Sequence, residues 1–552
     1  MSQPPPQQGF GAPYEPRPGV YGDPGQPQPG PQPGPYGQQS GPYGQPPQPQ
    51  IPPPSSGGRS RGRLVGLVAA VLAGVLVIGA GVWFVVGGDD GSDGKKLLAK
   101  ETAEPEQPGA ESNRKKTPAA EAAEINKGRK EGEAKVRWIQ RNGVDVPLGA
   151  SALGPWITGG IVAKAMYRTV SGYSLEDGSQ KWSLRLSADV CAAPTQPTAD
   201  GKIVIGLLTD TSADVEENCD KLQMIDLATG EAGWSVTIDR AVHNDLHRYV
   251  IMAISGDVVT IGGLRRAEAY RVSDGKHLWG KLPGPCEVEG FAGGSVMLAS
   301  VLCPAESKGE VDKEVRRVDP VTGRTLWTYK VRKDWNVDAF YSVDPPVIFL
   351  RNGPLVGGTS AIAVLNDDGT ARSQPVPGGD TLEGLCPGKE RDLGWNLDIC
   401  MGAAVDTETD TLYVTTKRRP VGRTKSRPVV RWFTNDVVAF DMSTGKKKWK
   451  VPSPATQTLM PLRVEGGKVL MYLSPPDPKT KGVGGGIMAL GPQGGTPQPV
   501  LRHPASAAAT ERTFDEPIVL HADGRSLLMI PHVSGDTDEE EMERRTMIAF
   551  GD

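Results

Sequence analysis

The sequence predicts an all-β fold, an eight-bladed β-propeller with seven blades as the alternative, preceded by one transmembrane helix and a disordered tail. Two observations predict the ring. A strand-and-hairpin signature recurs across residues 132–552, and the chain ends one strand short of a complete repeat while an isolated strand signature precedes the first repeat. A third observation, 23 consecutive residues without a charge at Leu64 to Val86, predicts the helix.

The recurring signature is an apolar strand, an Asp-Gly or Thr-Gly pair, three residues and a tryptophan, as in VDPVTGRTLWTYKV at residues 318–331. Five copies are complete, and two further copies keep the strand and the glycine without the tryptophan. The turn glycines of the seven copies are Gly178, Gly230, Gly275, Gly323, Gly369, Gly445 and Gly494. Their spacing is 45 to 52 residues apart from one gap of 76, a period typical of a propeller.

Each part of the signature has a physical reason. Residues 437–441 alternate as expected for a strand with two unlike faces, and glycine supplies the positive φ that a tight hairpin requires. Another apolar run precedes each hairpin, which predicts four strands, hence one blade, per unit. Five tryptophans at one offset from glycine indicate a repeat role rather than ordinary core positions.

The two ends of this region are expected to complete one blade together. The chain ends on the apolar strand RTMIAFGD, without the fourth strand and tryptophan of the other units. GEAKVRWIQRNG, residues 132–143, has the character of that missing strand, with Trp138 in the tryptophan position. An open ring would leave unpaired strand edges, so closure by this segment is favoured and gives eight blades.

The scheme Asp-x-x-Thr-Gly-x-x-x-Trp resembles the repeat of PQQ-binding-like β-propeller proteins, a family that includes quinoprotein alcohol dehydrogenases and the lipoprotein scaffold of bacterial outer-membrane assembly. The tail, span, spacer and ring together resemble membrane-anchored proteins of the actinobacterial cell envelope. In the propeller family such tryptophans dock one blade on the next. The resemblance implies this role for Trp138, Trp182, Trp234, Trp279, Trp327 and Trp449.

The region before the ring predicts its location. Residues 1–58 are mostly Pro, Gly, Gln, Ser and Tyr and are expected to form a disordered cytoplasmic tail. Residues 59–88 hold the transmembrane helix with its flanks; arginines precede it and aspartates follow it, so the ring is expected outside a cell membrane that the chain crosses once. Residues 89–131 are charged and indicate an extracellular spacer, with a short helix after Thr117 and Pro118.

All six cysteines fall in the outside portion, and an even number in an oxidising compartment predicts disulfides. Fifteen pairings are possible, but contacts in a repeat protein are mostly within a blade or with its neighbour. This favours the sequential pairs Cys191 with Cys219, Cys286 with Cys303, and Cys386 with Cys400. A metal cluster is the weaker interpretation because no C-x-x-C spacing occurs.

The sequence predicts no catalytic residue, no metal ligand and no cofactor. His243 and His247 are four apart but lack the glutamate of H-E-x-x-H, so they are expected to be polar loop residues. SGDTDEEEMERR, which begins at Ser534, lacks the spacing of a calcium loop and is expected to be a solvated hairpin tip. KGVGGG at Lys481 fits a loop between strands. A formal net charge of −4 gives no ground for nucleic-acid binding.

We therefore expect a single-pass membrane protein that presents a non-enzymatic propeller outside the cell membrane as a binding or scaffold module, with a protein or glycan ligand at its rim or channel. One alternative is a quinoprotein (PQQ-dependent) dehydrogenase, disfavoured because the chain has no adjacent Cys-Cys pair and no C-x-x-C-H motif. The other is an envelope sensor that signals through the tail. Function is expected where the pattern fails: the two units without tryptophan and the loop from Cys386 to Cys400.

Overall fold

The computed structural model describes the chain from Pro118 to Asp552, apart from the segments 144–149, 210–217, 239–249, 264–265, 306–309, 355–357, 385–395, 399, 423–431 and 536. The predicted tail, membrane helix and most of the predicted spacer lie outside the described residues, as do Cys386, His243 and His247. Within the described part of the chain, no helix is both long enough and apolar enough to cross a membrane.

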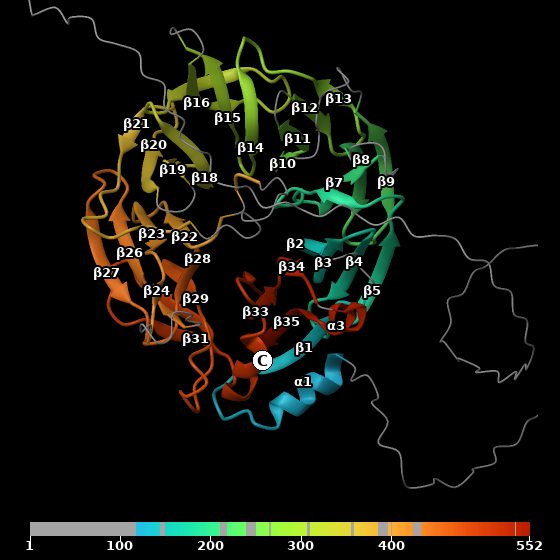
Figure 1. Cartoon of the computed structure of the whole chain (residues 1–552), viewed down its shortest axis with the longest axis vertical. Helices are drawn as coiled ribbons and strands as arrows, with labels where there is room; N and C mark the ends of the chain where they lie inside the picture. The colour runs from blue at the N-terminus through green and yellow to red at the C-terminus, as the bar shows by residue number, and fades with distance from the viewer. Residues whose placement is uncertain are drawn as a thin grey trace, which may run out of the picture. The chain divides into compact units, whose positions relative to one another are not determined.

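The described strands form a ring of eight antiparallel sheets, seven of four strands and one, in blade 1, extended to five by β34 (His532–Val533), which confirms the prediction of eight blades (Figure 1). Blade 1 comprises β2 (Ala150–Thr158), β3 (Ile161–Met166), β4 (Thr169–Ser174) and β5 (Gln180–Arg185). Blade 2 comprises β6 (Val190–Ala192), β7 (Lys202–Leu208), β8 (Cys219–Asp226) and β9 (Ala232–Thr237). Blade 3 comprises β10 (Ile251–Ser255), β11 (Val258–Gly263), β12 (Arg266–Arg271) and β13 (His277–Trp279). Blade 4 comprises β14 (Glu287–Ala292), β15 (Met297–Pro304), β16 (Val311–Val318) and β17 (Thr325–Lys330).

The second half of the ring repeats the same order, with the first strand of each blade nearest the centre (Figure 1). Blade 5 comprises β18 (Trp335–Val343), β19 (Pro346–Asn352), β20 (Thr359–Leu365) and β21 (Ala371–Ser373). Blade 6 comprises β22 (Ala403–Asp406), β23 (Thr411–Thr415), β26 (Asp436–Asp441) and β27 (Lys447–Pro452). Blade 7 comprises β28 (Leu459–Glu465), β29 (Lys468–Leu473), β30 (Gly486–Leu490) and β31 (Gln498–Arg502), so KGVGGG lies between two strands as predicted. Blade 8 comprises β32 (Ile518–Ala522), β33 (Arg525–Met529), β35 (Arg545–Gly551) and β1 (Lys135–Arg141).

Blade 8 closes the ring in the predicted way. Its outermost strand, β1, comes from the N-terminal side of the ring and pairs antiparallel with β35, the last strand of the chain, so that Val136 lies opposite Phe550 and Ile139 opposite Ile548. Trp138, between them, is fully buried. The pairing removes the open edge that β35 would otherwise present.

Several short helices and strands lie outside the four-stranded order of the blades. They are α1 (Pro118–Asn126), η1 (Ala505–Ala507), α2 (Ala508–Glu511), α3 (Asp538–Glu543), the small pair β24 (Arg419–Pro420) and β25 (Phe433–Thr434), and β34 (His532–Val533), which pairs with β2. The helix predicted after Thr117 and Pro118 is α1, which packs on the closing strand. The Glu121 carboxylate lies 2.9 Å from Arg141 of β1 and 2.6 Å from Arg545 of β35, so α1 holds both strands of the closure.

One expectation is wrong. The acidic stretch from Ser534 is not a hairpin tip, because residues 538–543 form the helix α3. The Thr537 hydroxyl accepts a hydrogen bond from the Glu540 amide at the start of this helix, and acidic side chains fill its first turn. Both features stabilise a helix N-terminus. The Glu541 side chain is buried under the helix.

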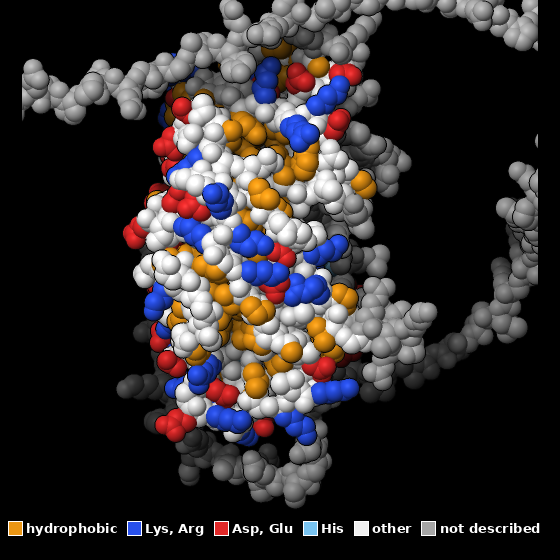
Figure 2. Space-filling view, turned by 90° about the vertical axis from the view of Figure 1, so that its left-hand side faces the viewer, with side chains coloured by type: hydrophobic (Ala, Val, Ile, Leu, Met, Phe, Trp, Pro, Cys, Tyr) orange, Lys and Arg blue, Asp and Glu red, His pale blue; other side chains and the backbone are white. Residues whose placement is uncertain are grey.

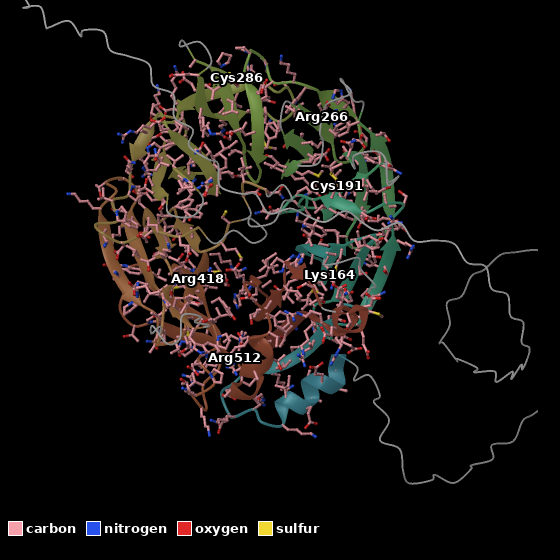
Figure 3. The ribbon with its side chains drawn as sticks, in the orientation of Figure 1. Lys164, Cys191, Arg266, Cys286, Arg418 and Arg512 are labelled. Atoms are coloured by element: carbon pink, nitrogen blue, oxygen red, sulfur yellow. A yellow bond between two sulfur atoms is a disulfide. The ribbon has the colours of Figure 1, made fainter. Side chains whose placement is uncertain are left out.

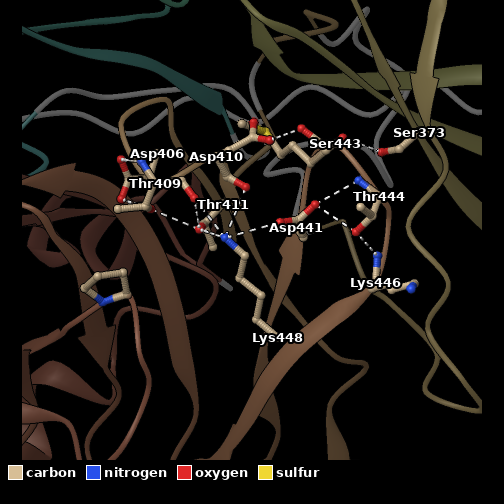
Figure 4. A network of polar contacts seen from close by, with 12 residues as sticks. Ser373, Asp406, Thr409, Asp410, Thr411, Asp441, Ser443, Thr444, Lys446 and Lys448 are labelled. Carbon is tan, nitrogen blue, oxygen red and sulfur yellow. Dashed lines mark hydrogen bonds and ion pairs between the residues drawn. The ribbon is translucent and has the colours of Figure 1, made fainter. Parts of the chain in front are cut away.

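The Asp-x-x-Thr-Gly part of the repeat has a clear role at its turns. The Asp441 carboxylate accepts hydrogen bonds from both the amide and the hydroxyl of Thr444, each at 2.8 Å, and so holds the turn that leads to Gly445 (Figure 4). These bonds keep the pKa of Asp441 below its usual range. Asp319 accepts from the amides of Val321 and Thr322 at the equivalent turn of blade 4. The aspartate of the repeat therefore stabilises the hairpin turn through hydrogen bonds to its side chain.

Candidate functional site

The repeat tryptophans dock each blade on the next. The indole of Trp138, for example, lies on Gly178 of blade 1, where a Cβ would come within 2.5 Å of Trp138 Cγ. Trp182, Trp234, Trp279, Trp327 and Trp449 lie in the same way on Gly230, Gly275, Gly323, Gly369 and Gly494. The turn glycines have φ between 68° and 82°, so glycine is required both by the backbone and by the close approach of the indole.

Blade 5 replaces its tryptophan with polar contacts. Ser373 stands at the tryptophan position and donates to the Met442 carbonyl at 2.6 Å, the carbonyl three residues before the turn glycine of blade 6. Trp234 and Trp279 donate to the equivalent carbonyls of their own neighbours. Arg372 adds an ion pair to Asp410 at 2.8 Å. A cavity of about 370 Å³ at this junction is lined partly by these two residues and Met442.

Blade 7 lacks a tryptophan for a different reason. The tryptophan of one blade contacts the turn between the third and fourth strands of the next. In blade 8 those two strands are β35 and β1, which come from opposite ends of the ring-forming chain, so no turn joins them. Gln498, at the tryptophan position of blade 7, therefore has no turn glycine to meet. The absence of the repeat tryptophan from blade 5 and from blade 7 thus has a structural explanation in each case.

A cavity lies at the closing seam, between blade 8 and blade 1. It has a volume of about 920 Å³, and we call it the seam groove. One wall is the end of β1 and the residues after it, 140–143, and the other is formed by residues 167–173 and 178–185 of blade 1. The buried floor includes Gln140, Ser171 and Tyr173, whereas Ser183 and Arg185 lie on the exposed rim.

The charged residues that line the seam groove are arginines, and two of them pair with acidic side chains outside the lining. Three arginines line it, and the lining residues include no aspartate or glutamate. Arg141 forms ion pairs with Glu121 and Glu543. Arg168 forms an ion pair with Asp189, and its guanidinium carbon lies 5.2 Å from the centroid of the Tyr167 ring. No ion pair of Arg185 is found among the described residues. Burial raises the pKa of the Tyr173 hydroxyl, which therefore stays protonated.

Two kinds of known protein resemble this chain. The family described as outer membrane protein assembly factor BamB matches residues 128–289, from just before β1 to the first residues of β14. The repeat is of the PQQ-like β-propeller type.

Among solved structures, BamB from Moraxella catarrhalis is 15% identical, with a TM-score of 0.38 over 76% of this chain and 100% of that one. The quinohemoprotein alcohol dehydrogenase from Comamonas testosteroni is 13% identical, with a TM-score of 0.42 over 79% of this chain and 80% of that one. No curated protein sequence matches the chain.

The centre of this PQQ-like ring holds part of the loop that the sequence singled out. Residues 396–398 contact the inner side of four consecutive blades. The Asn396 side chain accepts from the Met252 amide of blade 3 at 2.9 Å and donates to the Ala193 carbonyl of blade 2 at 2.7 Å. The Leu397 carbonyl accepts from the Phe340 amide of blade 5.

Asp398 completes this central cluster. Its carboxylate accepts from the Thr195 hydroxyl at 2.6 Å and from the Gly293 amide of blade 4 at 3.1 Å. Burial raises the pKa of Asp398 above its ordinary value, and the two hydrogen bonds oppose this shift. The described central residues thus use their polar atoms to tie the loop to the ring.

The central cluster does not fit the quinone cofactor that the family likeness suggests. Pyrroloquinoline quinone carries several carboxylates, which need cationic or free hydrogen-bond donors. Asn396 and Thr195 already donate within the cluster, and Asp398 adds a further carboxyl group. We therefore derive no step of chemistry through this cofactor.

Two of the predicted disulfides are confirmed: Cys191 with Cys219, and Cys286 with Cys303. Each lies within one blade, as expected for a repeat protein, and Figure 3 labels Cys191 in blade 2 and Cys286 in blade 4, with Arg266 of blade 3 between them. Cys400 is also disulfide-bonded. Its predicted partner, Cys386, lies outside the described residues.

Sequence reasoning missed a serine, histidine and glutamate that lie together between blades 7 and 8. His503 Nε2 is 2.6 Å from the Ser526 hydroxyl, and His503 Nδ1 is 2.9 Å from the Glu511 carboxylate, which also accepts from Tyr472. Ser526 is 0% exposed and His503 is 1% exposed. The arrangement presents no nucleophile to solvent, so it forms a buried polar network that joins two blades.

The outer face over blade 6 carries many lysines and arginines with acidic side chains among them (Figure 2). Their contacts are local. Lys447 and Lys450 of β27 share Asp380, at 2.8 Å and 2.6 Å, and Lys450 also pairs with Asp436. These lysines pair with the ring's own aspartates, as Arg141 and Arg168 of the seam groove pair with acidic side chains. The seam groove is the stronger candidate for an anion because it also holds Arg185, for which no ion pair is found among the described residues.

The arginines of the seam groove were also missed by sequence reasoning. They lie at the ends of strands in two different blades, and only the closure of the ring brings Arg141 beside Arg168 and Arg185. The predicted pairing of residues 132–143 with the end of the chain was the one signal that pointed to this junction.

Proposed function

We propose that this protein is a membrane-anchored, non-enzymatic binding module that holds an acidic, hydroxyl-rich ligand, of the acidic-glycan class, in the seam groove. The observation that carries the proposal is a groove of about 920 Å³ whose charged lining residues are all arginines. Guanidinium groups recognise carboxylates through paired hydrogen bonds. Hydroxyl, amide and tyrosine side chains around them suit the hydroxyl groups and apolar faces of sugars.

The anchor and orientation in this proposal come from the sequence. Leu64 to Val86 would cross the cell membrane once, with the propeller outside and residues 1–58 in the cytoplasm. A ring outside the membrane would meet the envelope polymers directly. The disulfides are consistent with an oxidising compartment.

Arg185 is the arginine of the seam groove best suited to testing ligand binding by substitution. Arg185 is exposed on the rim and has no ion pair among the described residues, so removing its charge should leave the fold intact. We expect R185Q, in a soluble chain of residues 108–552, to weaken binding of a uronate-containing oligosaccharide by about tenfold or more. Lys181→Gln is the matched control, because Lys181 lies on the same strand but does not line the groove.

Isothermal titration with the acidic oligosaccharide and with a neutral one of equal length provides the measurement. The proposal predicts binding of the acidic sugar alone, weakened by salt and by R185Q but not by K181Q. Equal binding of both sugars, or equal affinity of R185Q and the unaltered ring, would contradict it. A cofactor spectrum on addition of pyrroloquinoline quinone and calcium would instead support a quinoprotein dehydrogenase.

A further inference from the structure

One of the two described disulfides has a cation placed against its sulfur atoms. Arg316 Nη2, on β16, lies 2.8 Å from Cys286 Sγ and 3.3 Å from Cys303 Sγ. A disulfide sulfur is a weak acceptor and does not require such a partner. A thiolate, in contrast, is strongly stabilised by a neighbouring guanidinium group, which lowers the pKa of the thiol.

The position of Arg316 is fixed by a second contact. The Glu314 carboxylate accepts from Arg316 Nε at 3.0 Å and from Nη2 at 2.7 Å, and both side chains are nearly buried. Nη2 carries two hydrogens, enough for one bond to Glu314 and one to a sulfur atom. The carboxylate and the two cysteine sulfurs lie within 4.8 Å of one another. The Glu314 carboxylate therefore holds the guanidinium group beside the sulfurs of the disulfide.

The other disulfide lacks this arrangement. Cys191 and Cys219 join β6 to β8 across blade 2, and among the described residues no lysine or arginine hydrogen-bonds to either sulfur. The two bonds are thus a natural pair for comparison within one molecule. They share the fold and the solvent; they differ in the neighbouring cation, in the strands that they join and in sequence separation, 28 residues against 17.

We propose that the Cys286–Cys303 bond is a thiol–disulfide exchange site, reversibly reduced by a dithiol, while the Cys191–Cys219 bond is structural. Arg316 is a positioning residue that stabilises the leaving thiolate. Its closer approach to Cys286 assigns Cys286 as the leaving group and Cys303 as the sulfur attacked. The cysteines are 8% and 7% exposed, and the exposed Pro304 follows Cys303 directly, so the attacked sulfur lies at the edge of the blade.

One thiolate of the dithiol attacks Cys303 Sγ, the Cys286–Cys303 bond breaks, and its electron pair leaves on Cys286 Sγ as a thiolate bonded to Arg316. The second thiol of the dithiol then attacks the mixed disulfide, and Cys303 leaves and takes up a proton. The dithiol becomes a disulfide and loses two electrons and two protons; Cys303 keeps one proton and the other goes to solvent. A leaving thiol of low pKa speeds the first step.

The test compares the two bonds in the full chain. The protein is equilibrated in buffers of reduced and oxidised dithiothreitol, quenched with acid and alkylated, and the reduced fraction of each cysteine pair is measured by mass spectrometry. We expect Cys286–Cys303 to be half reduced at a thiol-to-disulfide ratio at least about tenfold lower than Cys191–Cys219, which corresponds to about 30 mV. Equal ratios for the two bonds would overturn the proposal without any variant.

Two substitutions then assign the effect to the cation. R316Q should raise the ratio needed for Cys286–Cys303 by about tenfold and leave Cys191–Cys219 unchanged. R317Q is the matched control, since Arg317 is the next residue of β16 and points to the other face of the blade. A shift of the same size in both variants, or in neither, would overturn the role of Arg316. If R316Q does not fold, the comparison of the two bonds in the unaltered chain still decides the proposal.

Discussion

Each repeat tryptophan of this ring acts on a glycine of the neighbouring blade rather than within its own. The indole of Trp327, on β17, covers Gly369 of blade 5, and its ring packs with the buried side chains between the two blades. A tryptophan in this position buries a large apolar surface and excludes any other residue type from the turn opposite. The stability of each junction that has a repeat tryptophan should therefore depend strongly on that side chain.

Replacing Trp327 tests how far the stability of the junction between blades 4 and 5 depends on its indole. Trp327→Ala is expected to lower the free energy of unfolding by about 3–5 kcal/mol, because it leaves a cavity between two blades. Leu326→Ala is the control, since Leu326 is the neighbouring residue and is 48% exposed; its cost should stay within about 0.5 kcal/mol. Urea unfolding of both variants measures the difference. Equal losses would show that the indole is not the principal contact.

Lys164 gives the ring a pH-dependent stability. This buried lysine of β3 donates to the Thr546 hydroxyl of β35 at 2.7 Å, and burial lowers its pKa from 10.5 to about 7 (Figure 3). Below pH 7 the folded ring must keep a buried charge, which costs up to about 5 kcal/mol. Between pH 7 and 10.5 the unfolded chain binds the extra proton, so the stability of the ring rises with pH.

The variant Lys164→Met should remove this pH dependence. It is expected to stabilise the ring most below pH 7, with the gain shrinking as the pH approaches 10.5. Thermal unfolding midpoints from pH 6 to 10 measure this, and Lys181→Met is the control because Lys181 is exposed. Unfolding curves that stay parallel across this pH range would contradict the assigned pKa.

At the scale of elements, the closing strand β1 is the structural centre of both the fold and the seam groove. It covers the edge of β35, supplies Trp138 to blade 1, and ends in one wall of the groove. α1 reinforces it through Glu121. Losing β1 should therefore affect the whole ring rather than one blade.

A chain that begins at residue 144 tests this role. Without β1 the edge of β35 is unpaired, so we expect this shorter chain to aggregate or to lose its cooperative unfolding transition. A chain beginning at residue 108 keeps α1 and β1 and should stay monomeric and folded. Size-exclusion chromatography and near-ultraviolet circular dichroism distinguish the two. A folded, monomeric chain without β1 would mean that seven blades are sufficient.

The sequence predicts the elements of this ring better than its surfaces. The repeat determines strands, turns and blade number because each unit carries the same local signals, and Trp138 marks the strand that closes the ring. α3 was missed although Thr537 and Glu540 form a capping pattern. The groove could not be predicted, because its walls come from two blades whose contact depends on ring closure.

At the scale of the whole molecule, the centre of the ring and the seam groove are the two places compared for a ligand. The described residues at the centre, Asn396 to Asp398, are bonded to four blades by their own polar atoms. The seam groove has rim side chains open to solvent, and its charged lining residues are arginines. We therefore propose that the ligand binds at the seam.

Amide hydrogen exchange of the ring, with and without a uronate-containing oligosaccharide, tests this claim most directly. It reports where a ligand slows exchange without any substitution. The account predicts slower exchange in residues 140–143, 167–173 and 178–185, with no change in the backbone around residues 396–398. Protection around residues 396–398 with none at the seam would contradict it and place the ligand at the centre of the ring.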